Sequence, residues 1–571
     1  MPKPQPSLPG LVIGGTGSNS GKTTLTLALL CALHERGLVA RAAKTGPDYI
    51  DAAFHAALTG QPAANLDTWM CREAAPSSAE RPLRGGSGPS NRPISGLPAG
   101  LKRVFVRMSA PCSPMLASGT TAATPDILPH IVPNILPNIL PDILVVEGAM
   151  GLFDGGHRGA GSTAHLAALL GLPLLLVLNA GGMGQSVAAL AEGFLRHRPV
   201  WAETRPLHFL GMVCTHVGSD RHADLLRQSL APVSKNSGVP LLGLMPRQGA
   251  PSLPARHLGL VEAREALPAV DRQALALWAE DHCNLDLLLQ RAGADTLRRA
   301  SPNHAATPAN DAQKLPQLSP EATPASRFFP AANSATRRSK RPLRIGLAWD
   351  EAFSFCYADL PAVLGELKAE VVTFSPLRDA APPPGCAGLY FPGGYPELHA
   401  ARIAANAQMR TALHHKAAQG MPMYGECGGY MYLMDSLLLD GQQYAMSGLL
   451  PRSCALGQTK AALGYRAALA HADWPTPSTT QSSIPKASAA STPLWVRGHE
   501  FHYAQEQADP LPAQCSPLWQ LHDSQGRFLR ADGCRMGSVA GSWLHCYPEG
   551  SRRFWRAWLG LCSAYLSAQG T

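Results

Sequence analysis

The sequence predicts an α/β chain in which a doubly wound, parallel-sheet domain is followed by a second α/β domain. Short apolar runs alternate with helical stretches and few hairpin signals separate them, which is typical of parallel sheets. The length of 571 residues exceeds what one hydrophobic core usually serves, and the hydrophobic content is 45%. From about residue 292 to 341 the composition shifts to Pro, Ala, Ser, Thr and Asn, as in a flexible linker. We therefore expect domains over 1–291 and 342–571.

Charge and cysteine content narrow the class of protein. The formal net charge of +9 favours an acidic partner, and a polyanionic small molecule satisfies it as well as nucleic acid does. Basic residues are dispersed outside the run 337–341, and no aromatic-interleaved basic motif favours nucleic acid. The thirteen cysteines are scattered without CxxC pairs, which fits reduced thiols in a cytoplasm. Neither a signal peptide nor an apolar run of membrane-spanning length is evident, so we expect a cytoplasmic protein without membrane contact.

The first motif is a Gly-rich loop between a strand and a helix. The apolar run 11–13 leads into the loop, and 25–33 has helical character. Successive backbone N–H groups and a helix N-terminus form an anion cradle, in which Lys22 reaches the β/γ-phosphates of ATP and the Thr23 hydroxyl binds Mg²⁺. The loop is one residue longer than the strict GxxxxGK spacing, because its first glycine falls at Gly15. The predicted ATP-binding residues here are Gly15, Thr16, Gly17, Ser18, Asn19, Ser20, Gly21, Lys22, Thr23 and Thr24.

Carboxylates and an amide follow other strands of this domain. The buried strand 142–148 contains Glu147 at its end, where a second Mg²⁺ ligand or a water-positioning group is needed. After the strand 39–43, Asp48 and Asp51 can hold Mg²⁺ or orient a substrate, and Lys44 can face a phosphate or a carboxylate. Asp48 can equally cap the helical stretch 52–58. Asn179, after the strand 174–178, either contacts the nucleotide base or is a turn residue.

The rest of the first domain continues the αβ alternation. Helices are expected over 163–170 and from 184–186 onward, strands over 209–213 and 241–244, and a closing helix over 272–291. Residues 75–141 are rich in Pro, Ser and Gly and end in a proline-punctuated near-repeat, which predicts an enlarged loop.

These motifs together resemble the ATP domain of cobyrinic acid a,c-diamide synthase, which is similar to dethiobiotin synthetase. The resemblance is carried by 15–24, 44–51, 65–67, 147–155 and 256–260, in this order. It implies that Lys22 and Thr23 bind the phosphates and Mg²⁺, and that Asp48 and Glu147 complete the metal site. It further implies a substrate-binding segment that includes Lys44, Asp48, Tyr49 and Asp51.

The second domain is organised around Cys427, in Gly425-Glu426-Cys427-Gly428-Gly429. Strands are expected over 344–348, 371–374 and 388–391, with a helical stretch at 364–367. A cysteine between glycines, where a strand turns sharply into a helix, is exposed for nucleophilic attack, although a structural cysteine beside a Gly-rich turn has the same pattern. Backbone N–H groups of Gly394 and Gly428 can form an oxyanion hole.

A thiol nucleophile needs a base, for which His545 is the candidate and His499 and His502 are the competitors. The order of Gly-Gly loop, cysteine elbow and late histidine resembles the class I (triad-type) glutamine amidotransferases. Many of these carry His-x-Glu, whereas three residues separate His545 from Glu549 here, so Glu549 is the weakest of the three predicted catalytic residues. The resemblance assigns the GHEFHY segment 498–503 to the corrinoid-diamide family. A low-complexity insert is expected over about 476–492.

The two sites together predict a carbon–nitrogen ligase with glutamine as amido donor. The resemblance implies that ATP activates the a and c carboxylates of cobyrinic or hydrogenobyrinic acid in cobalamin biosynthesis, and that ammonia from glutamine forms the amides. Cobyric acid synthase and nickel-sirohydrochlorin a,c-diamide synthase are alternatives within the class. A partitioning-type regulatory ATPase with an inert amidotransferase-like module is the alternative from another class. The expected cofactor is Mg²⁺, the partners are a corrinoid polycarboxylic acid, glutamine and ATP, and a homo-oligomer is left open.

Overall fold

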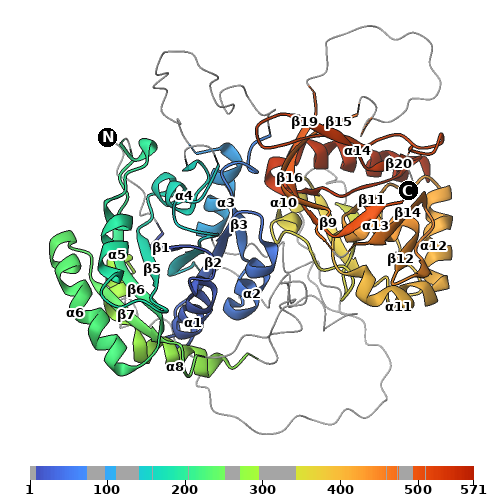
Figure 1. Cartoon of the computed structure of the whole chain (residues 1–571). Helices are drawn as coiled ribbons and strands as arrows, with labels where there is room; N and C mark the ends of the chain where they lie inside the picture. Colours follow the sequence, from blue (N-terminus) through green and yellow to red (C-terminus); the bar gives the residue numbers. More distant parts are fainter. Residues whose placement is uncertain are drawn as a thin grey trace, which may run out of the picture.

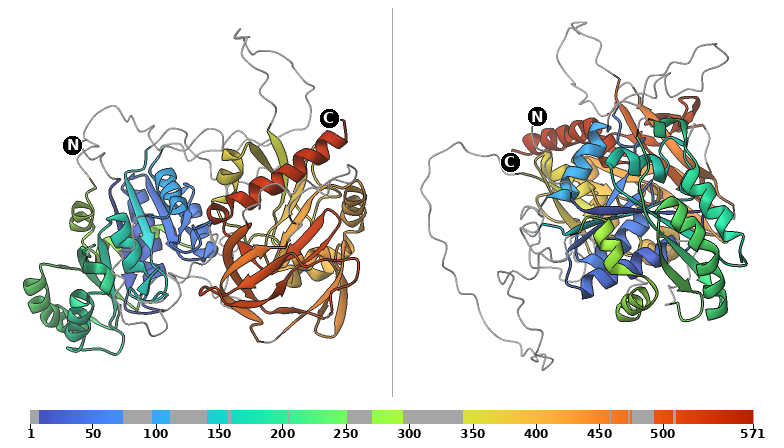
Figure 2. Two further views of the ribbon diagram at one scale, coloured as in Figure 1. Left: turned by 90° about the horizontal axis from the view of Figure 1, so that it is seen from above. Right: turned by 90° about the vertical axis from the view of Figure 1, so that its left-hand side faces the viewer.

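The computed structural model describes eleven stretches of the chain, which form two α/β bodies side by side, blue to green and yellow to red (Figures 1 and 2). The predicted linker beyond residue 294, the segment 256–260 and the insert 476–492 lie outside the described residues. Among the described residues, no helix is both long and apolar enough to cross a membrane. The described residues are 8–73, 97–110, 140–156, 159–203, 205–250, 270–294, 342–457, 459–471, 474, 493–507 and 510–570.

The first body is built on a seven-stranded sheet with the order β3-β2-β4-β1-β5-β6-β7. All neighbouring pairs are parallel, and most strand residues are buried, as expected for a sheet covered on both faces. Because β1 lies between β4 and β5, the loops that follow these three strands meet at one edge. The strands are β1 (Gly10–Gly15), β2 (Ala40–Thr45), β3 (Ala64–Leu66), β4 (Ile143–Glu147), β5 (Leu174–Asn179), β6 (Phe209–Val217) and β7 (Leu241–Pro246).

Helices of this body depart from the predictions at two places. The helix predicted over 272–291 is two helices, because Cys283 is extended and the side chain of Asn284 caps the next helix by accepting from the Leu287 N–H. The predicted loop 75–141 contains a helix, α3, in its described part. The helices are α1 (Lys22–Glu35), α2 (Tyr49–Thr59), α3 (Ala99–Ser109), α4 (Thr163–Leu170), α5 (Val187–Arg196), α6 (Asp220–Ser237), α8 (Arg272–His282) and α9 (Leu285–Arg291).

The second body holds a six-stranded sheet with the order β20-β21-β11-β10-β8-β9, parallel except for the pair β20–β21. The strand that leads to Cys427, β11, is central in it. The strands are β8 (Leu343–Ala348), β9 (Ala369–Phe374), β10 (Gly388–Phe391), β11 (Met423–Glu426), β20 (Cys534–Met536) and β21 (Val539–Ser542), and the helices are α10 (Leu360–Glu366), α11 (Ala400–Ala405), α12 (Ala407–Ala418), α13 (Gly428–Leu433) and α14 (Arg552–Ala568).

Two smaller sheets complete the second body, and sequence patterns did not indicate them. One has the order β13-β12-β14-β17, and the other is antiparallel with the order β19-β18-β15-β16-β22. Their strands are β12 (Met434–Leu439), β13 (Gln442–Ala445), β14 (Leu450–Leu456), β15 (Ala462–Ala470), β16 (Trp495–His502), β17 (Ala504–Glu506), β18 (Trp519–His522), β19 (Phe528–Asp532) and β22 (His545–Cys546).

The two bodies share a buried interface. The hydrophobic cluster of the first body includes four aromatic side chains of the second: Phe355, Tyr357, Tyr395 and Tyr547. Polar bonds accompany this packing, since Tyr547 donates to the Asn65 carbonyl at 2.6 Å and Tyr465 donates to the Asp67 carboxylate at 2.7 Å. A shared core of this kind fixes the position of one domain against the other.

Candidate active site

The Gly-rich loop after β1 forms the predicted cradle at the carboxyl edge of the first sheet. Two left-handed residues, Asn19 and Gly21, curl the loop before α1 begins at Lys22. A Cβ at Gly15 would lie 2.1 Å from the Ser20 hydroxyl, so the close turn requires glycine there. The Lys22 ammonium donates to the Gly17 carbonyl at 2.9 Å and to the Met150 carbonyl at 2.6 Å. Lys22 therefore lies across the mouth of the cradle, where phosphate oxygens would bind.

Glu147, at the end of β4, is the most extensively bonded group of this site. Its carboxylate accepts from the Thr23 hydroxyl at 2.6 Å and from the Lys44 ammonium at 2.7 Å, and it lies 2.8 Å from Nε2 of His55. Burial alone would raise the pKa of Glu147, but Lys44 and His55 outweigh it and hold the pKa below its usual range. The site therefore keeps a charged carboxylate beside a hydroxyl at the P-loop.

Thr23 and Glu147 fit a magnesium ion bound partly by the nucleotide. Mg²⁺ usually takes one or two protein oxygens and completes its shell with phosphates and water. In the described part of the chain, no group of three or more His, Cys, Asp or Glu side chains is arranged to hold a metal ion. Thr23 and Glu147 would hold the ion, which would neutralise phosphate charge.

Polar contacts beside Glu147 join the end of β2 to the start of α2. Lys44 bridges Glu147 and Asp51, with 2.6 Å between the Lys44 ammonium and the Asp51 carboxylate. Burial, and then the nearby Glu147, raise the pKa of Asp51 to about 6. Asp48 is the N-cap of α2 and accepts from the backbone N–H groups of Ile50 and Asp51. The capping alternative for Asp48 is thus confirmed, and its role as a metal or substrate ligand stays a prediction.

His55 was missed by the sequence analysis. It lies one helical turn after Asp51 on α2 and is fully buried against Glu147. The spacing of four residues, which places two side chains on one helix face, was the only available signal.

Asn179, at the end of β5, lies beside the P-loop. Its side-chain oxygen accepts from the Gly181 N–H at 3.0 Å, and its amide nitrogen is 3.5 Å from the Asn19 carbonyl. The first bond is that of a turn residue, which confirms that alternative. Contact with a nucleotide base stays a prediction.

Cys427 occupies the predicted sharp turn between β11 and α13. Its φ of 50° and ψ of −108° are strained for a residue with a side chain, as at other nucleophile elbows. Burial raises the pKa of the Cys427 thiol, and the charge of Glu397 adds to this, whereas the Gly428 N–H acts in the opposite direction. The predicted nucleophile is therefore a thiol at rest, and it would have to lose its proton in order to attack.

The two glycines of the predicted oxyanion hole are neighbours in space. A Cβ on Gly428 would lie 2.9 Å from the Gly394 nitrogen, and a Cβ on Gly394 would lie 2.0 Å from the Ala352 carbonyl. Both positions therefore require glycine, and the Gly394 nitrogen lies beside Gly428, the residue that follows Cys427. This proximity supports the predicted oxyanion role.

The thiol state of Cys427 gives a pH prediction. Because its pKa is raised, the thiolate fraction at pH 7 to 9 is small and grows about tenfold per pH unit. We expect iodoacetamide to alkylate Cys427 at a rate with this slope, measured by mass spectrometry of its peptide. A rate that levels off below pH 8 would contradict the raised pKa. An exposed-cysteine peptide provides the reference slope.

His545 begins β22 and lies directly opposite His499 of β16. The two imidazole rings stack with centroids 4.9 Å apart and an interplanar angle of 14°. Burial, and then the nearby His499 and His502, lower the pKa of His545 well below its usual value. In the part of the chain that the structure describes, Nε2 of His545 is buried without a hydrogen-bond partner. A neutral imidazole with a free ring nitrogen is the state that a general base requires.

Glu549 has a different position from the predicted one. It lies in a 3₁₀ turn after His545, fully buried, and its carboxylate bonds to Arg103 at 2.8 Å and to Arg107, both on α3 of the first domain. Within the described residues its carboxylate forms ion pairs with arginines and does not contact His545. The predicted orienting role of Glu549 is therefore wrong, because the three-residue spacing directs its side chain to the domain interface.

Family comparisons agree with this two-site geometry. Residues 11–261 match the CobQ/CobB/MinD/ParA nucleotide binding domain, and residues 344–552 match the CobB/CobQ-like glutamine amidotransferase domain. The hydrogenobyrinate a,c-diamide synthase of Brucella suis biovar 1 (strain 1330) is 36% identical over 545 residues, covering 94% of this chain and 98% of that protein. The chain belongs to the a,c-diamide synthase family.

Two further relatives span the same length. The hydrogenobyrinate a,c-diamide synthase of Rhizobium meliloti (strain 1021) is 34% identical over 94% of this chain and 98% of its own. The cobyrinate a,c-diamide synthase of Syntrophotalea carbinolica (strain DSM 2380 / NBRC 103641 / GraBd1) is 33% identical over 97% of this chain and 99% of its own. The predicted fold class and enzyme class are confirmed: the protein is an amide-forming ligase that uses ATP and glutamine.

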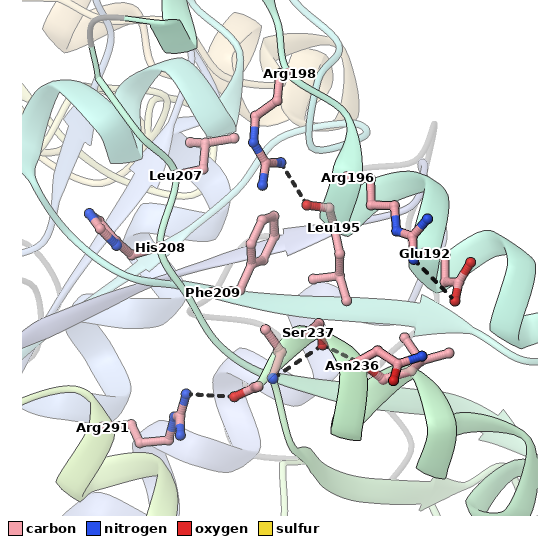
Figure 3. Close-up of a pocket in the computed structure, with 13 residues that line it drawn as sticks. Glu192, Leu195, Arg196, Arg198, Leu207, His208, Phe209, Asn236, Ser237 and Arg291 are labelled. Carbon is pink, nitrogen blue, oxygen red and sulfur yellow. Dashed lines mark hydrogen bonds and ion pairs between the residues drawn. The ribbon is translucent and has the colours of Figure 1, made fainter.

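A separate pocket of about 370 Å³ lies at the opposite edge of the first sheet (Figure 3). It is bordered by the start of β6 and the ends of α5 and α6. Arg198 donates to the Leu195 and His197 carbonyls, and Arg291 donates to the Gly238 carbonyl. The pocket is remote from the P-loop edge, so we assign it no part in the family reaction.

The ion pairs of Glu549 give a stability prediction. Burial would raise the pKa of Glu549, but Arg103 and Arg107 outweigh it, so the net pKa is lowered. Their stabilisation is therefore present at neutral pH and lost as the pH falls through the lowered pKa. We expect Arg107→Ala to reduce the free energy of unfolding by about 1–3 kcal/mol at pH 7, and by less in acid, in denaturant titrations.

Arg227→Ala is the matched control, because Arg227 pairs with Asp224 on the exposed face of α6. Its effect should be below about 0.5 kcal/mol at either pH. Equal effects of the two substitutions would show that Glu549 does not stabilise the interface.

Proposed function

We propose that the protein amidates the a and c carboxylates of cobyrinic or hydrogenobyrinic acid, with ATP, Mg²⁺ and glutamine. The observation that supports this most is the coverage of named a,c-diamide synthases over at least 94% of this chain, across both sites. The pairing of a charged Glu147–Thr23 site with a cysteine elbow fits a synthetase that makes its own ammonia.

Glutamine hydrolysis belongs to the second domain. The Cys427 sulfur attacks the amide carbon while His545 accepts the thiol proton, and the Gly394 and Gly428 N–H groups stabilise the oxyanion. The C–N bond then breaks, His545 returns the proton to the leaving nitrogen, and ammonia departs from a γ-glutamyl thioester. Water, deprotonated by His545, hydrolyses the thioester to glutamate and restores the thiol.

Carboxylate activation belongs to the first domain. A substrate carboxylate oxygen attacks the γ-phosphorus of ATP, giving an acyl phosphate and ADP, because phosphate is a far better leaving group than oxide. Lys22 and the loop N–H groups bind the phosphates, and Lys44 and His55 keep Glu147 charged beside Thr23. Ammonia then attacks the acyl carbon, phosphate leaves, and a base takes the proton that the amide nitrogen loses. Each amide consumes one ATP and one glutamine.

Mass spectrometry of the acid product tests the proposed substrate and the number of amides. Incubation with ATP, Mg²⁺ and glutamine should add two amides to cobyrinic or hydrogenobyrinic acid, with two ADP formed per molecule. Further amides on an a,c-diamide would favour the cobyric acid synthase alternative. Amidation of nickel-sirohydrochlorin with neither corrinoid acid reacting would overturn the proposal.

A further inference from the structure

The base His545 lacks a carboxylate partner within the described part of the chain. Glu549 is bonded to arginines of α3. Glu426, next to the nucleophile, accepts from the Tyr390 hydroxyl at 2.8 Å and from the Cys546 N–H at 3.2 Å. In a Cys-His pair a third group normally fixes the imidazole in its working orientation. Another group must fix it here.

His499 is in contact with the face of the His545 ring. β22 pairs with β16 so closely that a Cβ on Gly498 would lie 1.8 Å from the His545 carbonyl oxygen. This approach places the two imidazoles face to face, with ring centroids 4.9 Å apart and an interplanar angle of 14°. On another side, a Cβ on Gly393 would lie 2.5 Å from Cε1 of His545, so the oxyanion loop also packs on the ring. The ring is therefore confined by packing.

His499 is itself held in place. Its Nδ1 is hydrogen-bonded to the Tyr357 hydroxyl at 2.8 Å. It is buried, and burial lowers its pKa to about 4, so it stays neutral beside His545. A neutral aromatic ring offers its π face to the imidazolium that forms when His545 accepts a proton. Stacking can thus serve both orientation and charge stabilisation.

Tyr49 joins this cluster from the first domain. Its ring centroid lies 5.6 Å from that of His499 and 5.5 Å from that of His545. It is 7% exposed, so its position differs from that of an open substrate-binding residue. Tyr49 is the first residue of α2, which also carries Asp51 and His55 of the ATP site. One helix therefore touches both sites.

We propose that His499, held by Tyr357 and Tyr49, is the positioning residue that replaces the third triad member and makes the base depend on the ATP domain. The proposal rests on the roles of Cys427 and His545 given above. A stacked histidine would thus take the place that an acid has in the related sites.

Substitution of His499 tests the proposal in the full-length protein. His499→Ala should lower kcat for glutamine hydrolysis ten- to hundredfold, with KM for glutamine within threefold. His499→Phe keeps an aromatic face and should recover kcat to within fivefold of wild type. Ammonia-dependent amidation should stay within twofold in both, since it does not use His545. His522→Ala, on β18 of the same sheet, is the matched control and should change neither activity.

Several results would overturn it. These are an unchanged glutaminase kcat in His499→Ala, no recovery in His499→Phe, or an equal loss of ammonia-dependent amidation, which indicates a merely structural role. His545→Asn separates the inference from its basis: full glutaminase activity there would refute the proposed base itself. If His545→Asn loses glutaminase activity and His499→Ala does not, only the positioning role of His499 would be refuted.

Tyr49→Leu tests the link between the domains. Loss of the aromatic contact should reduce glutaminase kcat at least fivefold, while KM for the corrinoid acid in the ammonia-dependent reaction stays within twofold. A raised KM for the acid with unchanged glutaminase would return Tyr49 to the predicted substrate-binding role and overturn its part in the cluster.

Discussion

Cys427→Ala should abolish glutamine-dependent amidation, with a loss of at least about 10³-fold, and leave ammonia-dependent amidation within about threefold of wild type. The alanine removes the sulfur that forms the thioester, but it keeps the turn and does not touch the P-loop site. Both activities are measured as amide formation, detected by mass spectrometry, in reactions at alkaline pH that contain either glutamine or an ammonium salt.

The control for this variant is Cys356→Ala, which removes a free thiol that the proposed chemistry does not use, between the interface residues Phe355 and Tyr357. It should retain glutamine-dependent amidation. Loss of both activities in Cys427→Ala would contradict the division of labour between the two domains, provided that circular dichroism shows an intact fold.

Local features of the ATP site could be predicted from the sequence. A strand, a Gly-rich loop and a helix that begins at Lys22 are adjacent in the chain, so their geometry follows from local conformation. Glu147 could be found because a buried apolar strand ends there. His55 could not, because nothing in α2 shows that its face meets a strand more than ninety residues later.

The amidotransferase site was predictable only in part, for the same reason. Cys427 and its glycines form one local turn, whereas the partners of His545 depend on the pairing of β16 with β22, whose strands are separated in sequence. Register between distant strands is fixed by tertiary packing, which no single-segment pattern reveals. Glu549 was misassigned because its true partners lie on α3, a helix inside a stretch whose composition predicted a loop.

The domain interface includes residues of the first domain that follow α2. Three contacts cross it: Tyr547 bonds to Asn65, Tyr465 bonds to Asp67, and Arg497 packs on Trp69. The Arg497 guanidinium lies 4.5 Å from the Trp69 ring centroid, a cation–π distance. The same short segment that resembles the family at 65–67 thus serves domain contact, which explains why it accompanies the ATP motifs.

Glu147→Gln should reduce amidation at least about 10²-fold with either nitrogen source, and it should leave glutamine hydrolysis measurable. Glutamine keeps the size and one acceptor for Thr23 but removes the charge that balances Lys44 and His55. Without it, the proposed Mg²⁺ loses its only carboxylate from this strand, and ATP binding should require more Mg²⁺. ADP release and amide formation across a magnesium titration measure the effect.

Glu280→Gln is the matched control, since Glu280 pairs with Arg36 at the surface of the same domain and should leave amidation unchanged. Retained glutaminase in Glu147→Gln serves as the internal test of folding, because the second domain must stay intact to show it. Full amidation by Glu147→Gln would mean that its charge serves only the buried cluster with Lys44 and His55. In that case phosphoryl transfer to the carboxylate would depend on Lys22 and the loop N–H groups alone, and the metal role of Glu147 would be refuted.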